Sequence, residues 1–172
     1  RRAAGADASR LSIVTSRTLP PGWTGKLWAV KQGIDAAMAL PRPPDYLLLT
    51  DADIVHGPDS VRRLAARAQA GGLVLTSLMV KLRCESLAEH AGIPAFIFFF
   101  QMLYPFSWVN RPESAVAAAA GGCMLVRADA LVRAGGIETI RTALIDDCAL
   151  AKALKAQGPI WLGLTDRVHS IR

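Results

Sequence analysis

The sequence contains little that would indicate a disulfide-stabilised, zinc-binding or disordered protein. Its three cysteines, Cys84, Cys123 and Cys148, form no CxxC pair, and this spacing argues against both a zinc site and a disulfide framework. We therefore expect reduced thiols packed inside the protein. Charged residues make up only 20% of the chain and apolar residues 52%, which excludes a disordered tail. The first 20 residues lack the continuous apolar core of a secretory signal.

The chain has an excess of positive charge, but no segment of it concentrates arginine and lysine. The net charge is +6, but arginine and lysine are spread along the chain, and the aromatic residues, at 6%, cluster between Phe96 and Trp108. Nucleic-acid-binding proteins usually concentrate basic residues and interleave exposed aromatics with them. The pattern favours a basic surface that faces anionic lipid or a phosphorylated small molecule, with an ordinary solvated surface as the alternative.

The length of 172 residues predicts one domain over 1–172. The chain begins at Arg1 without a methionine and ends at Arg172 directly after an apolar run. We therefore expect an excerpt of a longer protein, truncated at both ends.

Strand-like and helix-like segments alternate along the chain. Apolar runs predict strands, and apolar residues at helical spacing between glycine and proline breaks predict helices. The predicted strands are 11–15, 46–50, 73–77, 123–126 and 160–164, and the predicted helices are 25–40, 57–70, 128–134 and 149–157. Because Tyr46–Thr50 is continuously apolar, it is typical of a parallel strand buried on both faces. We expect an α/β fold with a mostly parallel sheet flanked by helices.

A first pair of carboxylates, Asp51 and Asp53, directly follows the strand predicted at 46–50. Ligands of open α/β sheets bind beyond the carboxyl ends of strands, and carboxylate oxygens suit Mg²⁺ or Mn²⁺ shared with a diphosphate. The alternative is that the two aspartates only end the strand and cap a turn. Upstream, a glycine turn leads to Lys26 at the start of a predicted helix, where it could help to bind an anion.

A second acidic pair, Asp146 and Asp147, stands immediately before the helix predicted from residue 149. Aspartate is favoured at this position because it complements the helix dipole. Two adjacent acids exceed what a cap needs, so one of them is a candidate general base acting on a hydroxyl group.

These carboxylates leave two enzymatic functions open. One is metal-dependent glycosyl transfer. The other is hydrolysis of a phosphate ester, because Leu48–Val55 resembles the first motif of haloacid-dehalogenase-like phosphohydrolases, in which Asp51 would be the nucleophile. In that family the nucleophile usually follows the first strand of the core, whereas here a strand and a long helix are predicted before it. A non-enzymatic lipid-binding protein is a third possibility.

Several motifs in order resemble the family-2 glycosyltransferases of the GT-A fold. They run from about residue 11 to 172 and comprise Gly25-Lys26-x-x-Ala29, Asp51-x-Asp53, Gly121-Gly122-Cys-Met-Leu-Val-Arg127, Gly135-Gly136 and Asp146-Asp147-x-x-Leu150. The sequence is most similar to the hopanoid-biosynthesis-associated glycosyltransferases, through Pro20-Pro-Gly-Trp-Thr-Gly-Lys-Leu-Trp-Ala29, Leu82-Arg-Cys-Glu-Ser86, Tyr104-Pro-Phe-Ser-Trp-Val-Asn110 and Ile145-Asp-Asp-Cys-Ala-Leu150.

The resemblance implies a Rossmann-like GT-A domain and an inverting sugar transfer from a nucleotide-sugar, most simply a UDP-sugar, to a lipid or polyisoprenoid-type acceptor. It implies Mg²⁺ or Mn²⁺ at Asp51 and Asp53, and a location at the cytoplasmic face of the bacterial inner membrane. Donor-binding positions would be Lys26, Asp51, Asp53, Gly121 and Gly122. Asp147 would be the catalytic base, beside Asp146 at a position where the family often has Glu. His169 is a weak candidate for a third metal ligand, and Lys31, which replaces a frequent Asn, receives no role.

Residues 91–110 carry no formal charge. The stretch is about as long as a membrane span, but a span would separate Asp53 and Asp147 across the bilayer although one site needs both. We therefore expect an interfacial segment with Tyr104 and Trp108 at the level of the lipid headgroups. The alternative is a helix in the protein core under the sheet.

Overall fold

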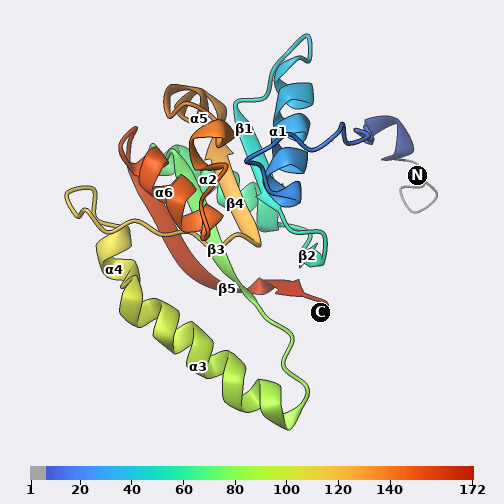
Figure 1. Cartoon of the computed structure of the whole chain (residues 1–172). Helices are drawn as coiled ribbons and strands as arrows, with labels where there is room; N and C mark the ends of the chain where they lie inside the picture. The colour runs from blue at the N-terminus through green and yellow to red at the C-terminus, as the bar shows by residue number, and fades with distance from the viewer. Residues whose placement is uncertain (1–6) are drawn as a thin grey trace.

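A computed structural model describes residues 7–172 and contains one five-stranded sheet with helices on both faces (Figure 1). The strands are β1 (Tyr46–Thr50), β2 (Ile54–His56), β3 (Leu75–Lys81), β4 (Cys123–Arg127) and β5 (Ile160–Ser170). The helices are α1 (Gly25–Met38), α2 (Ser60–Ala70), α3 (Leu87–Leu103), α4 (Phe106–Val109), α5 (Ala128–Arg133) and α6 (Asp146–Lys155), with the 3-10 helix η2 (Ile137–Ile140). The single domain over 1–172 stays a prediction, and its first six residues, including Arg1 and Arg2, lie outside the described part.

The sheet is mixed, and the prediction of a mostly parallel sheet was wrong. The strand order is β1-β4-β3-β5-β2, and of these neighbouring pairs only β3 and β5 are parallel. The reason is the position of β4, which lies between β1 and β3 and runs opposite to both. Strands β1 and β3 therefore point the same way without being hydrogen-bonded to each other. The α/β class is confirmed, whereas the GT-A fold stays a prediction.

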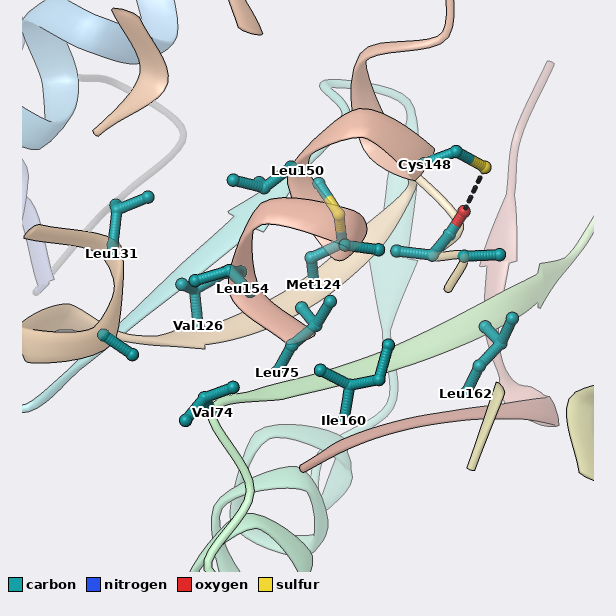
Figure 2. Close-up of a cluster of buried hydrophobic side chains, with 14 of the residues drawn as sticks. Val74, Leu75, Met124, Val126, Leu131, Cys148, Leu150, Leu154, Ile160 and Leu162 are labelled. Atoms are coloured by element: carbon teal, nitrogen blue, oxygen red, sulfur yellow. Dashed lines mark hydrogen bonds between the residues drawn. The ribbon is translucent and has the colours of Figure 1, made fainter. Parts of the chain in front are cut away.

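The two faces of the sheet carry different helices. Along β3, Leu75 and Met79 belong to the larger hydrophobic cluster, which also contains residues of α1, α6 and η2. Leu78 and Val80 on the opposite face belong to a smaller cluster with residues of α2. This alternation follows from the two-residue period of a strand. Figure 2 shows part of the larger cluster, in which Leu154 of α6 lies over β3 and β4.

The predicted elements differ from the observed ones mainly at their ends. Helix α6 begins at Asp146 instead of residue 149, and β5 continues to Ser170 instead of ending at residue 164. The prediction of a strand at residues 11–15 was wrong, because this segment forms no sheet pairing and is exposed. The chain just beyond it is instead held on α1, where the Arg17 amide donates to the Gln32 Oε1 at 2.8 Å. The Trp28 indole also donates to the Arg17 carbonyl.

Helix α3 covers most of the uncharged stretch and has no buried residue. It begins with a capping box between Ser86 and Glu89 and extends away from the sheet (Figure 1). Phe98 and Met102 are 66% and 62% exposed. The alternative of a core helix under the sheet was therefore wrong. No helix within residues 7–172 is both long and apolar enough to cross a membrane.

The chain that returns from α4 to β4 is fixed by Lys155 of α6. Its Nζ donates to the carbonyl oxygens of Val109 and Val116, at 2.8 and 2.6 Å. Burial lowers the pKa of Lys155 below its ordinary value. The contact holds the segment that leads to Gly121 against the C-terminal end of α6. All three cysteines are free thiols; Cys123 and Cys148 are buried and Cys84 is half-buried.

Candidate active site

A cavity of about 330 Å³ lies between α1, β1, β4, η2 and α6. Its interior is lined by aliphatic side chains, and its charged lining residues are few: Lys26, Asp51, Asp146 and Asp147. Gly121 also lines it. A largely apolar cavity with a few convergent charged groups is the usual form of a small-molecule site. Elements that are far apart in the sequence therefore bring Lys26, Asp51 of the first acidic pair and both members of the second pair, Asp146 and Asp147, to one place.

Lys26 stands between one member of each acidic pair. Its Nζ lies 3.4 Å from Asp51 Oδ1 and 3.4 Å from Asp146 Oδ2. The position is set by the start of α1, where the Thr24 side chain accepts a hydrogen bond from the Leu27 amide and caps the helix. Partial burial lowers the pKa of Lys26, but the charges of Asp146 and Asp51 outweigh this effect and raise it above its ordinary value. Lys26 is therefore a cation shared by the two carboxylates.

Asp147 is the most enclosed carboxylate of the site. Its Oδ2 accepts a hydrogen bond from the Gly121 amide at 2.9 Å, and its Oδ1 accepts one from the Cys148 amide at 2.7 Å. Burial raises the pKa of Asp147 above its ordinary value, although these two amide donors partly oppose the shift. A carboxylate of raised pKa that is held in a cavity is suited to accept a proton. Neighbouring Asp146 accepts a hydrogen bond from the Asp147 amide, and both acids lie in the first turn of α6, where they complement the helix dipole.

The adjacent glycines 121 and 122 have different surroundings. A methyl group on Gly121 would lie 3.4 Å from Asp147 Oδ2 and 3.6 Å from Lys26 Nζ, in the space between the two charged groups. A methyl group on Gly122 would instead meet Val80 and Ile54, at 3.3 and 3.4 Å, on the other face of the sheet. Gly121 thus leaves space beside Lys26 and Asp147 in the cavity, whereas Gly122 allows close packing of the core.

A hydrogen-bonded chain missed by sequence reasoning joins Thr50 at the end of β1 to Gly122 and to His56 at the end of β2. The Thr50 hydroxyl donates to the Gly122 carbonyl at 2.9 Å, and the same oxygen lies 2.9 Å from His56 Nε2. Because the only hydroxyl hydrogen of Thr50 is used, Nε2 of His56 is the donor of the second bond. Burial lowers the pKa of His56, which favours the neutral ring. The sequence feature that could have indicated this chain is the polar Thr50 at the end of the apolar run 46–50.

Asp53, Gly122 and His169 do not line the cavity. The Asp53 Oδ2 accepts a hydrogen bond from the Ser170 hydroxyl at 3.0 Å, and His169 is exposed on β5, where it pairs with Val55. Within residues 7–172 there is no group of three or more His, Cys, Asp or Glu side chains placed to hold a metal ion. Lys31 pairs with Asp35 and Glu138, linking α1 to η2.

A comparison with protein families matches residues 20–167 to the model of glycosyl transferase family 21. This match covers most of the chain and every residue of the site just described. The chain belongs to glycosyl transferase family 21. No curated protein matches it. Membership of this family confirms the predicted glycosyltransferase, while the resemblance to family 2 and to the hopanoid-associated enzymes stays a prediction.

In this family-21 glycosyltransferase, Lys26 and Gly121 border the cavity, and Asp147, whose pKa is raised by burial, lies beside them. The match also weighs against the phosphohydrolase alternative, because the matched region includes Asp51 and the strand before it.

Proposed function

We propose that this protein transfers a sugar from a nucleotide-sugar, most simply a UDP-sugar, to a hydroxyl group of a lipid-type acceptor with inversion at the anomeric carbon. The single observation that supports the proposal best is the convergence of one lysine and three aspartates at one cavity. An inverting transfer needs a base for the acceptor and a cationic environment for the departing diphosphate.

Asp147 is the proposed base. As the acceptor oxygen forms its bond to the anomeric carbon, the bond from this carbon to the diphosphate oxygen breaks on the opposite face, and the hydroxyl proton passes to Asp147. The hydrogen bonds from Gly121 and Cys148 hold the carboxylate in place for this step. Its raised pKa makes it a stronger base than an exposed aspartate. Asp146 keeps Lys26 beside the same space.

Lys26 is the proposed contact for the diphosphate. Its ammonium group lies at the same distance from Asp51 and Asp146. An arriving diphosphate would compete with these carboxylates for the ammonium protons. Gly121 supports this assignment, because its missing side chain leaves space between Lys26 and Asp147.

The carboxylates of Asp51 and Asp53 are the proposed metal-binding groups. Their hard oxygen atoms suit Mg²⁺ or Mn²⁺, and they are too few to hold the ion alone, which fits an ion shared with diphosphate oxygens. Asp51 borders the cavity, while Asp53 would have to exchange its bond from Ser170 for the metal. When bound, such an ion would stabilise negative charge on the leaving diphosphate.

The test is a binding and turnover experiment on the full-length protein with a panel of UDP-sugars, with and without Mn²⁺. We expect Mn²⁺-dependent binding of the donor, weakened by Asp53→Ala. We expect Asp147→Asn to retain this binding and to lose transfer by about 10²- to 10⁴-fold, the usual contribution of general base catalysis. Equal turnover of the variant and the parent would exclude Asp147 as the base. Phosphate release that is lost in Asp51→Asn would favour the hydrolase instead.

The lipid-type acceptor is supported by α3. This helix presents aromatic and aliphatic side chains without burying any of them, a pattern of segments that insert into a membrane interface. We propose that α3 lies at the cytoplasmic surface of a bacterial inner membrane and brings the acceptor to the cavity. A role in hopanoid biosynthesis rests on the resemblance alone.

Flotation with liposomes tests this placement. Phe98→Ser with Phe99→Ser should abolish flotation, because both side chains are exposed, whereas Phe100 packs on the core and is left intact. Val61→Ser with Val132→Ser is the matched control, since both valines are exposed on other helices. Undiminished flotation of the folded α3 variant would reject the membrane role of α3.

A further inference from the structure

A small basic hollow lies between α2 and β5, away from the proposed active site. It has a volume of about 100 Å³, and three arginines line it: Arg63, Arg67 and Arg167. The other lining residues that matter for binding are Trp161 and Thr165. Helix α2 packs on the sheet face opposite to the one that carries α1 and α6. The hollow therefore shares no lining residue with the cavity that contains Asp147.

The three guanidinium groups are brought together by different contacts. Arg67 lies over the indole of Trp161, 4.0 Å from the ring centroid, which orients its plane. Arg63 donates through Nε to Asp59, and Arg167 Nη1 lies 3.7 Å from the same carboxylate. The bond from Arg63 holds the pKa of Asp59 below its ordinary value, so that carboxylate is ionised. The cluster thus holds three positive charges and one negative charge.

Most hydrogen-bond donors of this cluster remain available. Each guanidinium group has five N–H donors, and the contacts with Asp59 use only part of those of Arg63 and Arg167. Arg67 forms no ion pair with a carboxylate in the part of the chain that the structure describes. The Thr165 hydroxyl accepts from the Arg167 amide, so its own hydrogen can point to a ligand.

We propose that this hollow binds a phosphate group. Planar guanidinium groups match the oxygens of phosphate in paired hydrogen bonds, and a surplus of two positive charges suits a phosphate dianion better than a carboxylate. The volume is well below the several hundred Å³ of a typical pocket for an organic ligand, so a headgroup or a free anion fits and a nucleotide does not. The source is either the headgroup of an anionic lipid or a free phosphate compound.

The test uses the full chain and two probes: inorganic phosphate at constant ionic strength, and phosphatidylcholine vesicles with or without phosphatidic acid. Trp161 supplies the signal for phosphate, because an anion that draws Arg67 off the ring should change the indole fluorescence. Trp161→Phe identifies this signal among those of the four tryptophans. We expect Arg67→Gln to weaken phosphate binding at least tenfold.

Arg62→Gln is the matched control. It removes one positive charge from the same helix, α2, but Arg62 does not line the hollow. Weakened binding of free phosphate in Arg67→Gln and not in Arg62→Gln supports the site with a soluble ligand. The same difference on phosphatidic acid vesicles identifies a lipid headgroup as the source. If the two folded variants bind both probes equally, or if neither probe binds the parent, the proposal is overturned. These outcomes are independent of sugar transfer.

Discussion

The neighbouring glycines 121 and 122 allow the proposed active site to be tested separately from the stability of the fold. Neither has a left-handed backbone, so alanine is acceptable at both in terms of conformation. At Gly121 the added methyl group would make ordinary contacts with Asp147 and Lys26, at 3.4 and 3.6 Å. At Gly122 it would meet Val80 at 3.3 Å, so this side chain would have to move by a few tenths of an ångström, and Ile54 at 3.4 Å.

The expected magnitudes follow from these distances. Gly121→Ala should leave the free energy of unfolding unchanged or raise it by about 0.4–1 kcal/mol, because alanine lowers the entropy of the unfolded chain. A donor oxygen must come within about 3 Å of Lys26 to form a hydrogen bond, and the methyl group occupies this approach. We therefore expect donor affinity to fall at least about tenfold, or about 1.4 kcal/mol.

Gly122→Ala should show the opposite pattern. Its methyl group enters the packed core between Val80 and Ile54, and overpacking of this kind costs about 1–3 kcal/mol. Its affinity for donor should stay close to that of the parent at a temperature where both are folded.

The assay combines urea unfolding with a titration of UDP in the presence of Mn²⁺, applied to both variants and the parent. The reasoning is refuted if Gly121→Ala binds UDP as well as the parent does, or if it is the less stable of the two variants. Either result would mean that the space between Lys26 and Asp147 does not receive the donor, or that the surroundings of the two glycines are not as described.

Three further predictions concern the contacts around the site. Since the pKa of Asp147 is raised by burial, ionising it costs folding free energy. The parent should therefore lose stability relative to Asp147→Asn as the pH rises from the ordinary pKa of 3.8 through the raised pKa of the folded protein. Urea unfolding at several pH values measures this difference in stability, and a difference that does not change with pH would contradict the prediction. Thr50→Val should destabilise the protein by about 0.5–1.5 kcal/mol, the net contribution of one hydrogen bond, because Thr50 is exposed and water can reach the Gly122 carbonyl that loses its donor. His56→Gln should cost less, since it keeps an N–H in a similar position. Equal losses in thermal unfolding would speak against the hydrogen-bonded chain. Lys155→Met should lower the free energy of unfolding by at least about 2 kcal/mol, because it leaves the carbonyls of Val109 and Val116 unpaired. Lys152→Met, on the exposed side of α6, should leave the free energy of unfolding nearly unchanged. The prediction fails if the two variants unfold at the same urea concentration.

Helices and strands were predictable from the sequence where residues within or directly beside the element mark it. The glycine turn before Lys26 marked the start of α1, and the apolar run 46–50 marked β1. The segment 11–15 was predicted incorrectly, because alternation alone cannot show whether a partner strand is present. In the structure, the buried Gln32 and the Trp28 indole hold the chain just after this segment instead.

The mixed sheet shows a second limit of sequence reasoning. A continuous apolar strand such as Tyr46–Thr50 fits a parallel neighbour, but its observed neighbour β4 comes from more than 70 residues further along and is antiparallel. In the same way, the uncharged residues of α3 allowed a core helix or an interfacial one. Only the absence of any buried side chain in α3 separates the two.

By itself, the sequence determined the chemical groups of this protein and their immediate setting: two aspartate pairs at the ends of secondary-structure elements, a lysine in the first turn of a helix, and glycines beside them. These features depend on neighbours within a few residues, which the chain order controls directly. Only the tertiary structure decided that Lys26 lies between Asp51 and Asp146, that Gly121 borders the cavity while Gly122 packs in the core, and that Asp53 bonds to Ser170. These contacts join residues that are tens of positions apart, so they depend on how the sheet orders its strands and on which face each helix packs.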